Sequence, residues 1–119
     1  MREENYSRSN REWLASIHGV AKTYKITADV QDADVQSGLP VAIASDGTAK
    51  LYTTGTPTIA EGEKVGLLVS DRVADKDGKL NGAVMIHGVI RRSHLPEVTK
   101  NVLEASADAV EPGLVIYEA

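Results

Sequence analysis

The chain has 119 residues, a formal net charge of −4 and no cysteine, which excludes disulfide bonds, thiol nucleophiles and thiolate metal sites. This length suits a single domain, and the apolar residues are mainly aliphatic, with one Trp, four Tyr and no Phe. A core poor in aromatic residues buries less area per residue, so we expect the protein to gain stability by associating with other chains.

The charge is distributed unevenly along the chain. Residues 1–25 carry five Lys/Arg and three Glu, about +2, and the remainder carries about −6. Binding to a nucleic acid requires a basic face that neutralises phosphates, so we expect no nucleic-acid partner. The start of the chain is charged and lacks the apolar region of a signal peptide, and no window has the length of a membrane span. We therefore expect synthesis in the cytoplasm and no membrane partner.

Residues 1–21 are predicted to form an N-terminal arm. Residues 1–12 have too little apolar area to offset the entropy lost on ordering. The only tryptophan, Trp13, then follows with Leu14 and Ile17 at helix-like spacing. Two interpretations of this segment remain open. It is either a short helix or turn that packs on the domain's own core, or an anchor that inserts into a partner, a role in which Trp is common.

Several strands are predicted after the arm. Residues 22–30 alternate between apolar and polar side chains, which is typical of a half-buried strand that could also join a neighbour's sheet. The acidic, turn-rich residues 31–38 are interpreted as a connection. Further strands are expected at residues 39–44, 49–52 and 64–70, with a hairpin turn at Asp46-Gly47, a loop at residues 53–62 and a second turn at residues 75–79.

A central strand is predicted from Gly82 to Val89, with Gly88 inside it, because both faces of its alternation are mostly apolar. Gly88 indicates a bulge, a bend or the close approach of another backbone, which favours a small barrel-like sheet. Pro96 then begins an amphipathic helix that extends to about Ala107, and residues 114–117 form a closing strand. The predicted fold class is therefore mainly β with one short helix (α+β).

No motif predicts catalysis, a metal or a cofactor. The histidines His18, His87 and His94 match no metal-ligand spacing. The turn that begins at Asp75 resembles the start of a calcium loop, but its twelfth position is Ile86 rather than an acidic residue. We therefore expect a protein that is not an enzyme and that binds no cofactor.

The order of several segments resembles the head-decoration proteins of tailed bacteriophages, the lambda-like group. The resemblance covers about residues 38–119. It is carried by Gly38-Leu-Pro-Val41, Asp46-Gly-Thr-Ala-Lys-Leu51, Val65-Gly-Leu-Leu-Val69, Ala83-Val-Met-Ile-His-Gly-Val-Ile-Arg-Arg92 and Leu95-Pro-Glu97.

This resemblance implies a β-clip-like small barrel domain over residues 22–119, a trimer at the threefold positions of the capsid, and no enzymatic activity. It also implies a place on the outer surface of the virion, with an arm that becomes ordered on strands of the major capsid protein. The residues expected in the capsid-binding arm are Tyr6, Arg8, Arg11, Trp13, Leu14, Ile17, Tyr24 and Ile26. Those expected at the interface between copies are His87, Gly88, Arg91 and Arg92. The alternative is a small β-barrel module that binds carbohydrate or peptide, against which the scarcity of aromatic residues counts.

Overall fold

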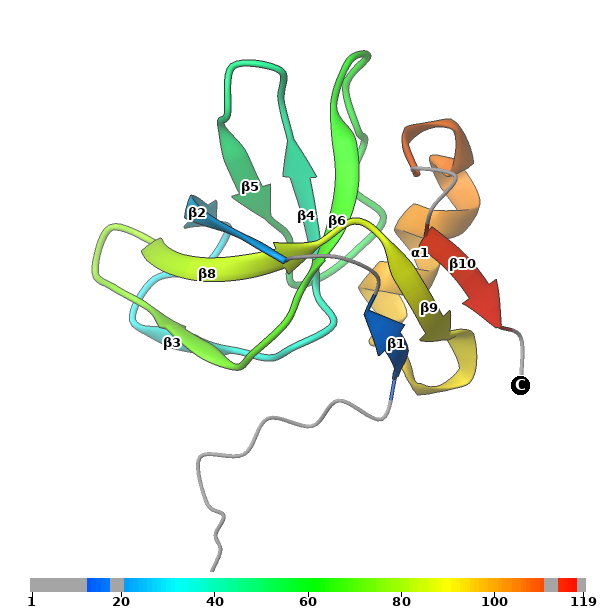
Figure 1. Cartoon of the computed structure of the whole chain (residues 1–119). Helices are drawn as coiled ribbons and strands as arrows, with labels where there is room; N and C mark the ends of the chain where they lie inside the picture. Colours follow the sequence, from blue (N-terminus) through cyan, green and yellow to red (C-terminus); the bar gives the residue numbers. More distant parts are fainter. Residues whose placement is uncertain (1–12, 18–20, 111–113, 118–119) are drawn as a thin grey trace, which may run out of the picture.

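The computed structural model describes residues 13–17, 21–110 and 114–117 (Figure 1). The described residues form a closed five-stranded barrel, a three-stranded sheet and a two-stranded sheet. The strands are β1 (Leu14–Ile17), β2 (Lys22–Ala28), β3 (Ala33–Val35), β4 (Pro40–Ile43), β5 (Ala49–Leu51), β6 (Lys64–Leu68), β7 (Arg72–Ala74), β8 (Lys79–Met85), β9 (Gly88–Arg91) and β10 (Leu114–Tyr117). The helices are the 3₁₀ turns η1 (Arg92–His94) and η2 (Ala107–Ala109) and the α-helix α1 (Glu97–Ala105). The predicted fold class, mainly β with one short helix, is confirmed.

The barrel has the strand order β2-β5-β4-β6-β8 and closes through antiparallel pairing of β2 with β8. Alternation in β2 places Ile26 and Ala28 in the interior, as the sequence pattern predicts. The β4–β5 hairpin turns at Asp46-Gly47, where Gly47 has a φ of 91° and the Ala44 N–H donates to the Thr48 carbonyl at 2.8 Å. The predicted hairpin is therefore confirmed.

The interpretation of residues 31–38 as a connection alone is wrong. Residues 33–35 form β3, which pairs antiparallel with β7 beside the barrel. Each of these two strands has three residues, and each buries only the residue at its C-terminal end, Val35 or Ala74. Strands this short and this exposed leave almost no alternation in the sequence, which is why the pattern did not predict them.

The prediction of one continuous central strand is also wrong. The chain leaves β8, a barrel strand, at Met85 and starts β9 at Gly88, in the other sheet. Gly88 has a φ of 143°, a backbone conformation that side chains other than glycine rarely adopt. It is paired with Ile17 of β1 on one side and with Leu114 of β10 on the other. The expected bend is confirmed directly before this glycine, at Ile86 and His87, where the chain passes from one sheet to the other.

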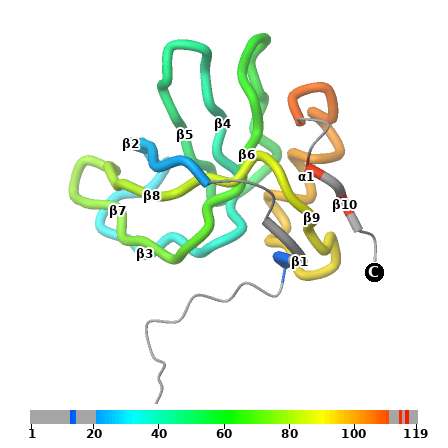
Figure 2. Tube along the Cα trace, viewed as in Figure 1, coloured from blue at the N-terminus to red at the C-terminus, as the bar shows by residue number. Residues whose placement is uncertain are grey.

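The three-stranded sheet, in the order β1-β9-β10, lies with α1 at the side of the barrel (Figures 1 and 2). A second apolar cluster fills the space between this sheet, α1 and the barrel strands β6 and β8. Its buried members are Trp13, Leu67, Val69, Met85, Ile90, Leu95, Leu103 and Leu114.

The helix α1 follows Pro96 and starts at Glu97, close to the predicted bounds, and it buries Val98, Thr99, Val102 and Leu103. Within the described ranges, no helix is long and apolar enough to cross a membrane.

Candidate functional site

Trp13 lies inside the second apolar cluster, with 2% of its surface exposed. Its indole Nε1–H donates a hydrogen bond to Ser37 Oγ at 3.2 Å. Its ring lies against Gly38, where an added Cβ would come within 3.0 Å of the indole nitrogen. The structure therefore matches the first interpretation of Trp13, as a residue of the domain's own core. An indole in this position is not available as an anchor for a partner.

The segment after Trp13 is a strand, not the helix or turn expected from the spacing of Leu14 and Ile17. Leu14 pairs with Ile90, and Ile17 pairs with Gly88, with a register shift between Leu14 and Ser16. The predicted boundary after residue 21 consequently does not separate an arm from the domain, because β1 is already part of a sheet. Leu14 is half-buried against the second cluster. Of the expected arm residues, Tyr6, Arg8 and Arg11 lie outside the described residues.

The last two expected arm residues belong to the barrel strand β2. Ile26 is 1% exposed inside the barrel, so it cannot contact a capsid while the barrel is closed. Tyr24 is half-buried at the edge of the same core, with the Lys22 ammonium 5.6 Å from its ring centre. The assignment of Ile26 to a binding arm is therefore wrong, because β2 is held between β5 and β8.

The four residues expected at an interface between copies lie at or next to β9. His87 is exposed, whereas Gly88 is buried between two strands. Arg91 donates from Nη1 to the Leu14 carbonyl at 3.0 Å, and its backbone N–H donates to the Trp13 carbonyl. Arg92 pairs with Glu104 of α1. Both arginines therefore have partners within this chain, and their place at an interface stays a prediction.

Two polar residues close to Trp13, Ser37 and Thr99, were not predicted from the sequence as part of this cluster of contacts. Ser37 accepts the indole hydrogen bond, and Thr99, which is fully buried, donates from Oγ1 to the Gly38 carbonyl at 2.6 Å. Together with Trp13 they join β1, the segment before β4 and α1. Thr99 could have been identified in the sequence as a polar residue within the apolar stripe of an amphipathic helix, because a buried hydroxyl usually has a hydrogen-bond partner.

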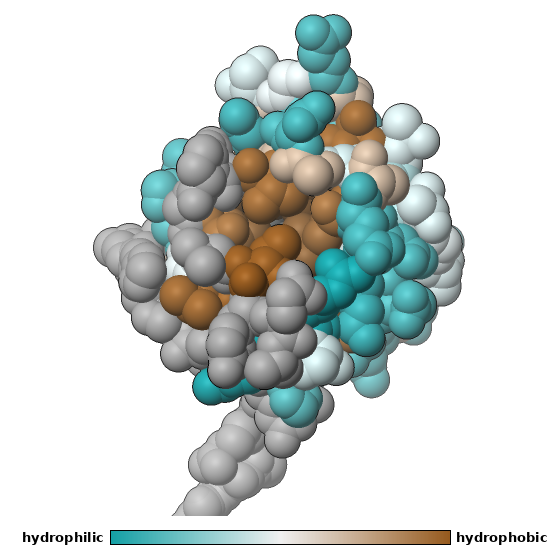
Figure 3. Space-filling view, turned by 90° about the vertical axis from the view of Figure 1, so that its right-hand side faces the viewer, coloured by the Kyte–Doolittle hydropathy of each residue, from teal (hydrophilic) through white to brown (hydrophobic). Residues whose placement is uncertain are grey.

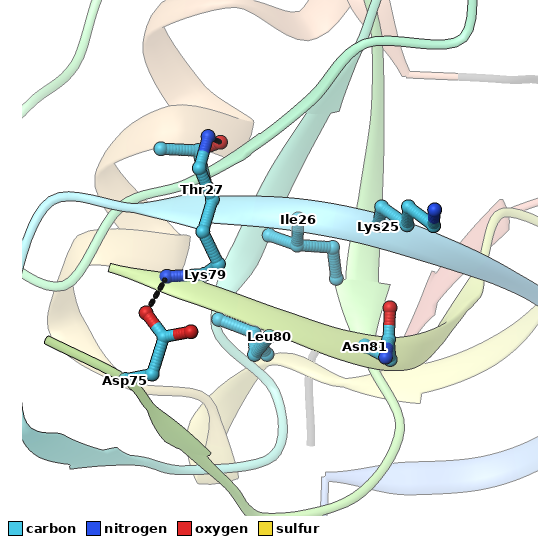
Figure 4. A pocket seen from close by; sticks show the side chains of 7 residues that line it. All are labelled: Lys25, Ile26, Thr27, Asp75, Lys79, Leu80 and Asn81. Carbon is cyan, nitrogen blue, oxygen red and sulfur yellow. Dashed lines mark hydrogen bonds between the residues drawn. The ribbon is translucent and has the colours of Figure 1, made fainter. Parts of the chain in front are cut away.

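A shallow depression of about 450 Å³ lies on the outer face of β2 and β8 (Figure 4). It is lined by Lys25, Ile26, Thr27, Asp75, Lys79, Leu80 and Asn81. The Lys79 Nζ donates to Thr27 Oγ1 at 3.0 Å, and the dashed line in Figure 4 marks the bond between Lys79 and Asp75.

The carboxylate of Asp75 has a structural role in its turn. It accepts hydrogen bonds from the backbone N–H groups of Lys79 and Asp77, and these hydrogen bonds lower the pKa of Asp75 below 3.8. Asp46 has a similar role in the β4–β5 hairpin, where the Thr48 N–H lowers its pKa.

A second depression, of about 460 Å³, lies between the loop at residues 59–64 and the end of α1. Neither depression is lined by an aromatic residue or by a histidine. Within the part of the chain that the structure describes, no three His, Asp or Glu side chains are grouped so that they could hold a metal ion.

No protein-family model matches the sequence, and neither a curated protein nor a solved structure gives a significant match to the chain.

Proposed function

We propose that the chain is a decoration protein that binds the outer surface of a tailed-phage head and stabilises the shell. Its partner in this proposal is the major capsid protein. It acts as an oligomer, most simply as a trimer at the threefold positions. In this proposal the protein is located on the outer surface of the virion.

The observation that supports this proposal most is the position of β1. Residues 1–12 precede a strand that is added to the edge of β9, so the start of the chain meets the fold at the rim of an open three-stranded sheet. A segment at such a position can reach a neighbouring protein without disturbing the barrel. Strand pairing with a partner is a common way for an extended segment to attach one protein to another.

The segments that carry the resemblance form successive elements of the fold. These elements are the β4–β5 hairpin, β6, the passage from β8 through Gly88 to β9, and the Leu95-Pro96-Glu97 entry to α1. In this proposal the folded domain lies on the surface of the shell, and residues 1–12, including Tyr6, Arg8 and Arg11, bind the capsid.

The alternative of a carbohydrate- or peptide-binding module has less support. Sugar-binding sites are usually concave and lined by aromatic side chains, and the two depressions have no aromatic lining residue.

Electron microscopy of undecorated phage shells mixed with the purified protein tests the proposal. We expect added density on the outer surface at threefold positions, and shells that resist heating better than shells without the protein. Shells that remain bare at saturating protein concentration would contradict the proposed function.

A further inference from the structure

The exposed edge of β10 is the feature from which we draw the further inference. Among the described residues, β10 pairs only with β9, so its second edge carries no strand. An open strand edge presents unpaired N–H and C=O groups to any other strand. Proteins usually protect such edges with a charge, a proline or a bulge.

The two outer strands of this sheet differ in that protection. The pairing of β1 with β9 shifts register between Leu14 and Ser16, which disturbs the regular spacing of its backbone groups. The pairing of β10 with β9 runs without interruption from Leu114 to Tyr117. The sequence of β10, Leu-Val-Ile-Tyr, contains neither a charge nor a proline. Over the described residues 114–117, the β10 edge is thus regular and contains no charge, proline or bulge.

The surface beside this edge is also apolar. Figure 3 looks onto the side of the molecule where α1 and β10 lie in Figure 1, and it shows a hydrophobic area near the centre of that face. Val110 and Ile116 are partly buried residues that pack on the second apolar cluster and keep part of their surface in solvent. A partner at this edge would gain apolar contacts in addition to backbone hydrogen bonds.

We propose that the β10 edge binds the β10 edge of a second copy of this chain, so that two three-stranded sheets join into one six-stranded sheet. Antiparallel pairing about a twofold axis at Val115 sets Val115 opposite Val115, and Leu114 opposite Ile116, of the other copy, with no charge between them. Such a contact is self-complementary and needs no other protein.

The chain's own first segment is a poorer occupant of this edge. Residues 1–12 contain three Arg and three Glu, and such a segment would bring charges against an apolar strand and an apolar surface. The aliphatic core, poor in aromatic residues, gives a further reason why burial against a second copy would stabilise the fold. This inference does not depend on the proposed function, since a twofold contact can join free chains or neighbouring oligomers on a shell.

The test uses Val115, which the register places beside the half-buried Val89 of β9. Val115→Lys brings two positive charges close together at the joined edges, and we expect it to weaken self-association about tenfold or more. Val89→Lys is the matched control, because it adds the same charge at the neighbouring position of the central strand, away from the edge. Association is measured by sedimentation equilibrium over a wide concentration range, beside thermal melts.

Mixing Val115→Lys with Val115→Glu should restore association, because opposite charges then meet at the edge. This rescue keeps the test decisive even where one variant is less stable alone. A wild-type chain that is monomeric at every concentration would overturn the inference. The inference would also be overturned if Val115→Lys and Val89→Lys changed the self-association constant equally.

Discussion

The indole Nε1 of Trp13 donates a hydrogen bond to Ser37 Oγ at 3.2 Å, and this contact links the first described strand to a segment 24 residues later. The ring lies beside Gly38, whose carbonyl accepts the hydroxyl of Thr99 from α1. Three separate parts of the chain therefore meet at one buried tryptophan, and the strand that follows residues 1–12 is held by the core of the domain.

Trp13→Ala should destabilise the isolated protein by about 3–5 kcal/mol, because it leaves a large cavity in the second apolar cluster. The free energy of unfolding is measured by urea titration followed by circular dichroism. Trp13→Phe is the matched control, which keeps an apolar ring without the N–H group, and it should be clearly less destabilising. An unchanged urea midpoint for Trp13→Ala would show that the indole does not stabilise the domain.

Gly88→Ala should destabilise the protein by at least about 1–3 kcal/mol, because a φ of 143° is strained for any residue with a Cβ. Gly55→Ala is the control. It also has a positive φ, 81°, but an added Cβ there meets nothing within 4 Å. We expect Gly88→Ala to lower the melting temperature more than Gly55→Ala. If the two substitutions lowered the melting temperature equally, the pairing of Gly88 with β1 and β10 would add no cost to the backbone strain that both positions share.

Thr99→Val should destabilise the fold by roughly 1–3 kcal/mol, because it keeps the shape of the side chain but leaves the buried Gly38 carbonyl without its hydroxyl donor. Arg92→Ala serves as a comparison. It removes the ion pair with the exposed Glu104, which should contribute no more than about 1 kcal/mol. Chemical unfolding of both variants gives the comparison, and a larger loss for Arg92→Ala than for Thr99→Val would contradict this account.

Acid should weaken the turn at residues 75–79. The Lys79 and Asp77 N–H groups lower the pKa of Asp75 in the folded protein below 3.8, so its contribution to stability is present above that pH. The contribution is lost as the pH falls below 3.8 and then through the lower pKa that Asp75 has in the folded protein. Asp75→Asn should therefore lose less stability than the wild type between pH 7 and pH 3. Parallel pH profiles of the urea midpoint for the two proteins would be inconsistent with this role.

The sequence was most informative where local patterns determine structure. The alternation that begins at Lys22, the Asp46-Gly47 turn and the apolar stripe after Pro96 predict β2, the β4–β5 hairpin and α1, because each depends on neighbouring residues. The bend at Gly88 could also be predicted, since a glycine within an apolar run usually marks a bend, a bulge or a close backbone approach.

The parts that could not be predicted depend on residues far apart in the sequence. Leu14 and Ile17 have a spacing that suits a helix, but their segment is a strand because β9, more than 70 residues later, offers it an edge. The break between β8 and β9 leaves no mark other than Gly88, because the residues on both sides are mostly apolar, and Met85 before the break and Ile90 after it are buried in the same cluster. The burial of Trp13 depends on Ser37 and Gly38, which no local pattern connects with it.

Co-sedimentation with undecorated phage shells is the most direct test of the central claim, that residues 1–12 bind the partner while Trp13 and β1 belong to the folded domain. The full chain is compared with a variant that starts at Trp13, and both are also melted alone. We predict that the full chain sediments with the shells, that the shortened variant binds at least about 100-fold more weakly because several arms act together in each oligomer, and that the two melt at the same temperature. A shortened variant that sediments as well as the full chain would contradict the account.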